Sequence, residues 1–470
     1  MKRQIWRVCS VLLAILLVFG PAPELFAAGG RTDRVTVDYR SISGWPAGPE
    51  INSEAACLID LQTGAVLYEK NADEVLYPAS ITKVLTALLI VENCDLNGMV
   101  TFSHNSVTDL DSDGISGLMA EGDQLSVKDC LYVLMLKSSN ETAYALAEYM
   151  SGSVEAFAEE MNRKAKELGA THSNFANPHG LFHENHYTTA EDMARIFWGA
   201  IQNDLFLEID STPRYTAAAT TPWPNGFTVD MRHQMLVPGS EYYDADVVAG
   251  KTGYIQKAQN TLVTYGVRGE RELVCVTLKA ESRAQSFEDT KKLLDYGFDQ
   301  FSVYDAAAQA DMAALQAEAS KSLNNVESLT LDENGFLLLP KEADYSNVDV
   351  ALTMGEPETN DSCSGQLVYS YQGQKIGEIP ITAKMKSAPK PSDGNLPETT
   401  LAAPSTFETS KESTDNAGFF SGWSAWQITA ACLLCALALV VLFLVIFQWA
   451  IHRRRKKLRE QRRRNRQRYQ

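Results

Sequence analysis

The sequence contains few of the residues from which metal sites and disulfide frameworks are built. Seven histidines and eight cysteines are spread over 470 residues, with no His-Glu-x-x-His pattern and no internal repeat. Three cysteines lie in the apolar segments near the chain ends, which leaves an odd number without tight spacing: Cys57, Cys94, Cys130, Cys275 and Cys363. A chain of this length can bury a core without cross-links, so a disulfide scaffold and a cysteine-ligated zinc site are disfavoured, and no cofactor is expected.

Two short segments resemble metal sites without their full pattern. His179, His183 and His186 cluster in PHGLFHENHYTT, but their spacing is not that of a zinc-binding helix. Residues 109–121 open with alternating acids like a calcium loop, yet Ala120 stands where the bidentate glutamate belongs. We expect a structural loop at the first segment and a solvated acidic loop at the second.

The first 28 residues are typical of a secretory signal peptide. Lys2, Arg3 and Arg7 precede an apolar run of about a dozen residues, and small residues follow near Ala27 and Ala28. An uncleaved membrane anchor is the alternative, but the apolar run is short for a span. We therefore expect the chain to be exported.

A second apolar segment, residues 426–451, is long enough to cross a bilayer. Its apolar stretch has about the 20 residues that a helix needs to span the hydrocarbon core. Residues 452–470 then contain eleven Lys/Arg and one acid, and such a flank stays in the cytoplasm. Nucleic-acid binding by this tail is the less favoured alternative. We expect a single-pass membrane protein whose region before the span lies outside the cell.

The exported part of the chain is acidic. The whole chain carries −17, and without the +10 of residues 452–470 and the +2 of residues 1–28 the remainder carries −29. Such a surface repels a phosphate backbone, so no nucleic acid is expected as a partner. Residues 387–422 are rich in Pro, Ser, Thr and charge, and we expect a disordered linker there.

Residues 45–305 mix strand and helix patterns. EAACLIDLQTGAVLYEKN and QNTLVTYGVRGERELVCVTLKA each predict a hairpin with a glycine in its turn. Helical patterns lie between them, and the first opens with Ser126 and Asp129 in capping-box spacing. Outer strands around a helical middle predict an α+β domain with an antiparallel sheet. A connecting helix in AAAQADMAALQAEA and a small β-rich domain over residues 322–386 are expected to follow.

The first chemical motif is Ser80-x-x-Lys83 in YPASITKVLTALLI. Pro78 disfavours a helix before it, so we expect a helix to begin near Ser80 and to place Lys83 over the Ser80 side chain. A serine hydroxyl needs a neighbour that accepts its proton, and a lysine can do so when burial or a nearby cation lowers its pKa. A capped core helix with a solvent-reaching lysine gives the same pattern, so this motif alone is weak.

Two further motifs follow in order along the chain. LKSSNETA supplies Ser138 and Asn140, and AGKTGYIQKAQNTLV places Lys251, Thr252 and Gly253 where a strand is expected to start. A serine–lysine pair, a Ser-x-Asn and a Lys-Thr-Gly form the motif set of penicillin-binding proteins and class A β-lactamases. Chance seldom produces all three in one chain, so the set is far more specific than any member of it.

With these motifs, residues 50–300 resemble the serine D-alanyl-D-alanine carboxypeptidases, the low-molecular-mass penicillin-binding proteins. The segments LIDLQTGAVLYEKNADE, GSVEAFAEEMNRKAKELGATHSNFANPHGL and HYTTAEDMA fit that family as well. The resemblance implies a β-lactamase/transpeptidase-like α+β catalytic domain, with an antiparallel sheet and a helical subdomain. It extends to the small β-rich domain expected over residues 322–386.

The resemblance also implies a role for each motif residue. Ser80 would be the acylated nucleophile, Lys83 its base and Ser138 a proton relay. Substrate binding would fall to a second group: Asn140, Lys251, Thr252, Gly253 and Tyr254. The backbone N–H groups of Ser80 and Tyr254 would form the oxyanion hole.

The implied substrate is a peptidoglycan stem peptide that ends in D-Ala-D-Ala. An acyl-enzyme on Ser80 would form with release of D-alanine and then be hydrolysed, and β-lactams would acylate the same serine as inhibitors. A D,D-endopeptidase or transpeptidase, a β-lactamase and an inactive wall-binding protein are the alternatives. Two positions depart from the family: Ser139 replaces the usual glycine, and Ile255 replaces a common threonine, which puts the rate or the substrate preference in question.

Overall fold

The computed structural model describes residues 45–108, 116–323, 326–331, 335–355 and 362–385. The predicted signal peptide, linker, membrane span and basic tail lie outside these residues, as do the leading acids of the calcium-like segment. Among the helices within the described ranges, none is both long and apolar enough to cross a membrane.

A five-stranded antiparallel sheet forms the centre of the α+β domain predicted over residues 45–305, with the strand order β2-β1-β9-β8-β7. Its strands are β1 (Ala55–Asp60), β2 (Val66–Lys70), β7 (Val247–Ile255), β8 (Gln259–Arg268) and β9 (Arg271–Ala280). Both predicted hairpins are confirmed, and their turns contain Gly64 and Gly269 at φ values of +70° and +65° that favour glycine. Strand β7 lies at one edge of the sheet, where its outer side is open to an extended peptide.

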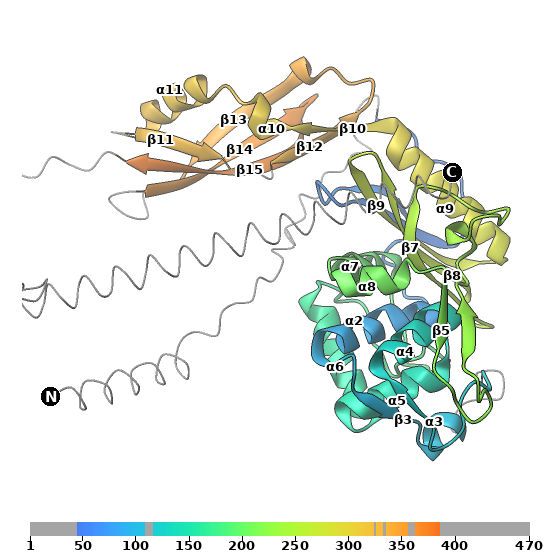
Figure 1. Cartoon of the computed structure of the whole chain (residues 1–470). Coiled ribbons are helices and arrows are strands. Elements are labelled where there is room, and N and C mark those ends of the chain that lie inside the picture. Colours follow the sequence, from blue (N-terminus) through green and yellow to red (C-terminus); the bar gives the residue numbers. More distant parts are fainter. Residues whose placement is uncertain (1–44, 109–115, 324–325, 332–334, 356–361, 386–470) are drawn as a thin grey trace, which may run out of the picture. The chain divides into compact units, whose positions relative to one another are not determined.

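Helices cover both faces of this sheet, and most of them lie on one side (Figure 1). That side carries α2 (Lys83–Asn93), α3 (His104–Thr108), α4 (Val127–Tyr132), α5 (Asn140–Ser151), α6 (Val154–Glu167), α7 (Ala190–Ile201) and α8 (Asp204–Asp210). The other face packs against α9 (Arg283–Gln300). Strand β1 is buried throughout because alternate residues enter the two cores, such as Cys57 toward the helical side and Leu58 toward α9.

Two small two-stranded antiparallel sheets complete this domain. They pair β3 (Met99–Thr101) with β4 (Gln124–Ser126) and β5 (Arg214–Ala217) with β6 (Phe227–Asp230). The predicted helix start at Ser126 is confirmed, because the Ser126 hydroxyl caps α4 by accepting from the Asp129 N–H and also donates to the Asp129 carboxylate. This α+β arrangement is the predicted fold class.

The structure corrects two predicted helices. The α-helix expected to begin near Ser80 begins at Lys83, and a 3-10 turn, η2 (Ala79–Thr82), precedes it. The helix expected to open at Ser126 ends as an α-helix at Tyr132 and continues as one π-helical turn, η4 (Val133–Lys137), before the chain turns at Ser138. Both irregular turns lead directly into a predicted catalytic motif, where π turns and tight turns are common.

The segment after α9 is rich in strands, as predicted. A four-stranded sheet has the order β11-β15-β14-β13, and β12 pairs with β10. The strands are β10 (Phe301–Asp305), β11 (Val326–Leu331), β12 (Phe336–Pro340), β13 (Val348–Met354), β14 (Ser362–Tyr371) and β15 (Gln374–Met385). The connecting helix is in fact two, α10 (Ala306–Gln309) and α11 (Met312–Ser322), because Asp311 caps the second one.

A buried ion pair ties the sheet to the end of α9. Asp60 is fully buried and accepts from the backbone and hydroxyl of Thr63 and, at 2.7 Å, from Arg271. Arg271 also donates to the carbonyl oxygens of Gly297 and Phe301. One guanidinium therefore joins β1, β9 and the junction between α9 and β10.

The substitution Arg271→Leu tests this anchor. It leaves the Asp60 carboxylate buried without its cation, and we expect a loss of about 3–5 kcal/mol in the free energy of unfolding. Arg163→Leu is the control, because Arg163 is an exposed arginine paired with Glu160 and should cost less than about 1 kcal/mol. Chemical denaturation of both variants decides the matter, and equal small losses would show that the anchor contributes little.

Candidate active site

The structure brings the three predicted motifs together around two lysine side chains. The Lys83 Nζ lies 3.0 Å from the Ser80 Oγ and 2.6 Å from the Asn140 Oδ1. The Lys251 Nζ lies 2.9 Å from the Ser138 Oγ. Residues more than a hundred positions apart in the chain therefore meet in one cluster, as the motif set predicts.

The segment that carries Ser80 is held on several sides. Ala79 has a left-handed φ of +52°, unusual for a residue with a side chain, and it is fully buried. The Thr261 hydroxyl donates to the Pro78 carbonyl oxygen at 2.8 Å. A Cβ on Gly180 would collide with the Ala79 carbonyl oxygen. Strained backbone of this kind is stable only where the surroundings fix it, and here they fix the half-buried Ser80.

Strand β7 approaches the same turn through Gly253. A Cβ at position 253 would lie 2.8 Å from the Ser80 backbone nitrogen and 3.1 Å from that of Ile81. Only glycine allows the edge strand to come this close to the N–H groups at the start of the turn. The N–H groups of Ser80 and of Tyr254, which follows Gly253, are thus placed in the same small region.

Lys83 is fully buried and has three polar neighbours. Besides Ser80 and Asn140, the carbonyl oxygen of His179 lies 2.6 Å from its Nζ. Burial lowers the pKa of Lys83 well below its usual value, and the charges of Lys251 and Arg232 lower it further. A neutral amine has two N–H groups, which match Asn140 and His179, and its lone pair then faces the hydroxyl of Ser80.

Lys251 is nearly as buried as Lys83. Its Nζ donates to the Ser138 Oγ and, at 2.9 Å, to the Thr252 carbonyl oxygen. Burial, followed by the charge of Arg232, lowers the pKa of Lys251 to about 7. Ser138 has a left-handed φ of +64°, which turns its hydroxyl from the end of η4 toward Lys251.

The Lys-Thr-Gly motif lies within strand β7, not at its start. The strand begins at Val247, so Lys251 is its central residue and Gly253 lies in its second half, and the predicted strand start was wrong. The four apolar residues ahead of the motif extend the β pattern backward. Tyr254 and Ile255 follow at the end of the strand, and the Tyr254 side chain is exposed.

The departure at Ser139 serves a local structural role. Its hydroxyl accepts from the Thr142 N–H to cap α5 and donates to the carboxylate of Glu141, which is fully buried. Glu141 also accepts from the backbone and hydroxyl of Ser116 and from the Gly117 N–H. The extra side chain at 139 is thus bound into a network that joins the second motif to residues 116–117.

The three clustered histidines do not converge. His183 is exposed, whereas His179 contributes its backbone carbonyl to Lys83. His186 accepts from the Ala176 N–H, so its other ring nitrogen donates to the Thr82 hydroxyl at 2.8 Å. Over the described residues no group of three potential ligands is arranged to hold a metal ion.

Sequence reasoning missed three contributors to this site. Arg232 lowers the pKa of both lysines, and nothing in its local sequence marks it. The His179 carbonyl could not be foreseen because a backbone group leaves no signal in the residue type. Asp210 is buried and interacts electrostatically with Lys251.

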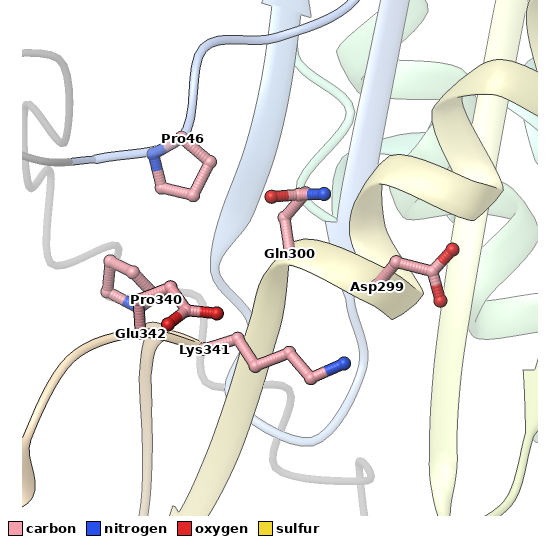
Figure 2. A pocket seen from close by; sticks show the side chains of 6 residues that line it. All are labelled: Pro46, Asp299, Gln300, Pro340, Lys341 and Glu342. Atoms are coloured by element: carbon pink, nitrogen blue, oxygen red, sulfur yellow. The ribbon is translucent and has the colours of Figure 1, made fainter.

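A separate hollow lies away from these residues. Figure 2 shows the side chains that line it: Pro46, Asp299, Gln300, Pro340, Lys341 and Glu342. None of them belongs to the lysine cluster or carries a nucleophile beside a base. The candidate active site is therefore the cluster around Ser80 and not this hollow.

Comparison with known proteins identifies relatives of the same kind. D-alanyl-D-alanine carboxypeptidase DacF of Bacillus subtilis is 29% identical over 393 residues, which cover 81% of this chain and 95% of that protein. A D-alanyl-D-alanine endopeptidase of Pseudomonas aeruginosa is 29% identical over 53% of this chain and 79% of its own length. The structure of penicillin-binding protein 5 from Haemophilus influenzae superposes with a TM-score of 0.59 at 24% identity, over 73% of this chain and 99% of that one.

The family comparison covers the catalytic region. The sequence model described as D-alanyl-D-alanine carboxypeptidase matches residues 44–282, which is half of the chain and contains all three motifs. The resemblance drawn from the motifs is confirmed, and so is the predicted activity of a serine-type D-alanyl-D-alanine carboxypeptidase. The chain belongs to the D-alanyl-D-alanine carboxypeptidase family.

Proposed function

We propose that this protein trims peptidoglycan stem pentapeptides by acyl transfer to Ser80, with Lys83 as the base and Ser138 as the proton relay. The observation that carries the proposal is the environment of Lys83. Two acceptors occupy its N–H groups while its lone pair faces a hydroxyl 3.0 Å away. A buried lysine in this state is a base and not a cation.

Acylation follows from this geometry. The Ser80 oxygen attacks the carbonyl carbon between the two D-alanines, and its proton passes to the Lys83 nitrogen. The developing oxyanion is stabilised by the N–H groups of Ser80 and Tyr254, which Gly253 allows to lie close together. The tetrahedral intermediate then expels the amine of the terminal D-alanine.

The leaving amine needs a proton, and Ser138 is placed to deliver one. Its hydroxyl hydrogen-bonds to Lys251 at 2.9 Å, so it can donate its own proton to the amine and recover the proton that Lys83 took from Ser80, which returns Lys83 to the neutral amine. Water then attacks the acyl-enzyme while the neutral Lys83 accepts its proton, and Lys83 passes that proton to the Ser80 oxygen as the ester bond breaks. Ser80 is regenerated, and the peptide leaves one residue shorter.

Positive charge gathers where the substrate carboxylate would bind. Lys251 and the Thr252 hydroxyl lie on the edge strand, and Arg232 acts on both buried lysines. A free C-terminal carboxylate meets both charge and hydrogen-bond donors here. This arrangement favours a terminal D-alanine over an internal residue and thus carboxypeptidase over endopeptidase action, although one relative is named an endopeptidase.

We further propose that the chain is exported and anchored by residues 426–451, with its catalytic region outside the cell and residues 452–470 in the cytoplasm. The support is the sequence: a short apolar leader, a stretch of spanning length and a dense basic flank. The substrate chemistry agrees with this placement because peptidoglycan lies outside the membrane.

Ser80→Ala tests the nucleophile and the reaction together. The unsubstituted protein should release D-alanine from a wall pentapeptide and gain a penicillin adduct on the peptide that contains Ser80, and the variant should do neither. Product analysis and mass spectrometry measure the two outcomes. An adduct on Ser138 would reverse the assigned roles, and cleavage of cross-linked dimers without D-alanine release would favour the endopeptidase.

Lys83→Met and Lys83→Arg test the base. Methionine keeps the apolar bulk, and arginine keeps the charge but cannot release its proton at usable pH. Both should slow acylation by at least ~10²-fold, the typical cost of a lost general base. In the unsubstituted protein the base must be neutral, so acylation should fall as the pH drops through the lowered pKa of Lys83. Stopped-flow acylation with a fluorescent penicillin measures this, and near-native rates in a folded Lys83→Met variant would contradict the mechanism.

Protease treatment of intact cells tests the topology. External protease should cut within residues 387–422 and release a soluble fragment that still binds penicillin, because the linker is expected to be accessible. An epitope placed after residue 470 should remain protected until the cells are opened. Its digestion in intact cells would place the tail outside and overturn the orientation.

A further inference from the structure

Lys251 has an unusual set of charged neighbours. Arg232 and Arg283 both oppose its positive charge, and burial opposes it more strongly than either. Asp210 is the carboxylate that acts in the other direction. A lysine meant to bind a substrate carboxylate must keep its proton, so Asp210 opposes the combined effect of burial and two cations.

Asp210 is a buried acid without a hydrogen bond. It is the last residue of α8, is fully buried, and has no hydrogen-bond partner for either carboxylate oxygen among the described residues. The Gly250 N–H lies near enough to favour the ionised form but does not reach hydrogen-bond geometry. Buried carboxylates are nearly always paired, so one without a partner indicates a role other than structural support.

Among the cations on the elements that pack against α8, Lys251 is the one that interacts with Asp210. Helix α8 packs against α2, α4, η4, α7 and β7. The cations on these elements are Lys83, Lys128, Lys137, Arg195 and Lys251, and Lys251 is the one whose charge acts on Asp210. Beside Gly250, the ring of His233 is buried and bonds to Thr264, and burial lowers its pKa to about 3, so it is neutral.

We propose that Asp210 is a positioning residue of the reaction, whose carboxyl packs against β7 as the counter-charge that keeps Lys251 protonated for the substrate carboxylate. The inference rests on the substrate-binding role proposed above for Lys251. The ionised pair, a carboxylate and an ammonium, contains the same number of protons as the neutral pair, a carboxylic acid and an amine. The pair can therefore respond to an arriving carboxylate without taking a proton from solvent.

The directions of the pKa shifts agree with a coupled pair. Burial raises the pKa of Asp210 and lowers that of Lys251, whereas each group's charge shifts the other's pKa back. The effect reaches the base as well, because a charged Lys251 helps to lower the pKa of Lys83. Asp210 thus influences substrate binding through Lys251, and it influences proton abstraction indirectly, because the charge of Lys251 affects the pKa of Lys83.

Asp210→Asn removes the charge and keeps the shape, and Asp204→Asn is the matched control. Asp204 is an exposed aspartate at the other end of the same helix. The measurements are kcat/KM for a D-Ala-D-Ala pentapeptide and the rate of penicillin acylation, both from pH 5 to pH 10. In Asp210→Asn, Lys251 should lose its proton at lower pH. The fall of both pH profiles on the alkaline side should therefore begin about one pH unit or more lower than in the unsubstituted protein.

The acid limb should move in the opposite direction, because a less charged Lys251 lowers the pKa of Lys83 less. KM should also rise more than kcat falls, and Asp204→Asn should leave both limbs in place. Asp210→Ala should repeat the shifts if the asparagine variant folds poorly, and thermal melts monitor both.

The outcomes separate this inference from the proposed function. An unsubstituted protein that forms no penicillin adduct contradicts the proposed function itself. If the unsubstituted protein acylates normally and the folded Asp210→Asn variant has the same acid and alkaline limits in its pH profile, the role of Asp210 is overturned and the proposed function stands. A loss of rate that is uniform across pH also overturns it, because a merely structural residue would have that effect.

Discussion

The burial of Lys83 is the constraint on which the rest of the site depends. A lysine that loses its hydration without a paired carboxylate is costly as a cation, by about several kcal/mol, so it gives up its proton. The protein retains the amine by supplying acceptors from two distant segments, the Asn140 side chain and the His179 backbone. What remains on the nitrogen is the lone pair that faces Ser80, and so the geometry that allows Lys83 to be buried also suits it to the base role proposed for it.

The backbone around the motifs adopts unusual conformations that hold Ser80 and Ser138 beside the two lysines. Ala79, which precedes the first motif, and Ser138, which opens the second, both adopt left-handed φ values, and Gly180 and Gly253 let other segments approach the turn that carries Ser80. Left-handed backbone at residues with side chains costs about 1 kcal/mol or more each. The extensive buried core between the sheet and the helices offsets this cost and holds Ser80 in one place. The site is rigid because the surrounding core is well packed.

Local patterns predicted the parts of the fold that local forces decide. The two long hairpins, the capping box at Ser126 and the pairing of Ser80 with Lys83 all follow from spacing within one element. Some local features were mispredicted, among them the 3-10 turn before Lys83, which β7 and Gly180 contact closely, and the position of Lys251 within its strand. Arg232 and Asp210 could not be found, because tertiary packing alone brings them near the lysines. The membrane segments lie outside the described residues and stay predictions.

The two departures from the family differ in what they can change. Ser139 has an ordinary φ of −65°, so no backbone reason requires glycine there, and its side chain joins the buried Glu141 network. That network leaves Ser138 and Asn140 in contact with their lysines. Ile255 instead ends the edge strand two residues after Gly253, where an extended substrate would lie. A missing hydroxyl at that position removes a donor from the substrate path without disturbing Lys83. The catalytic cluster and the substrate path can therefore vary separately in this fold, because buried lysine chemistry governs the first and the exposed edge of β7 governs the second.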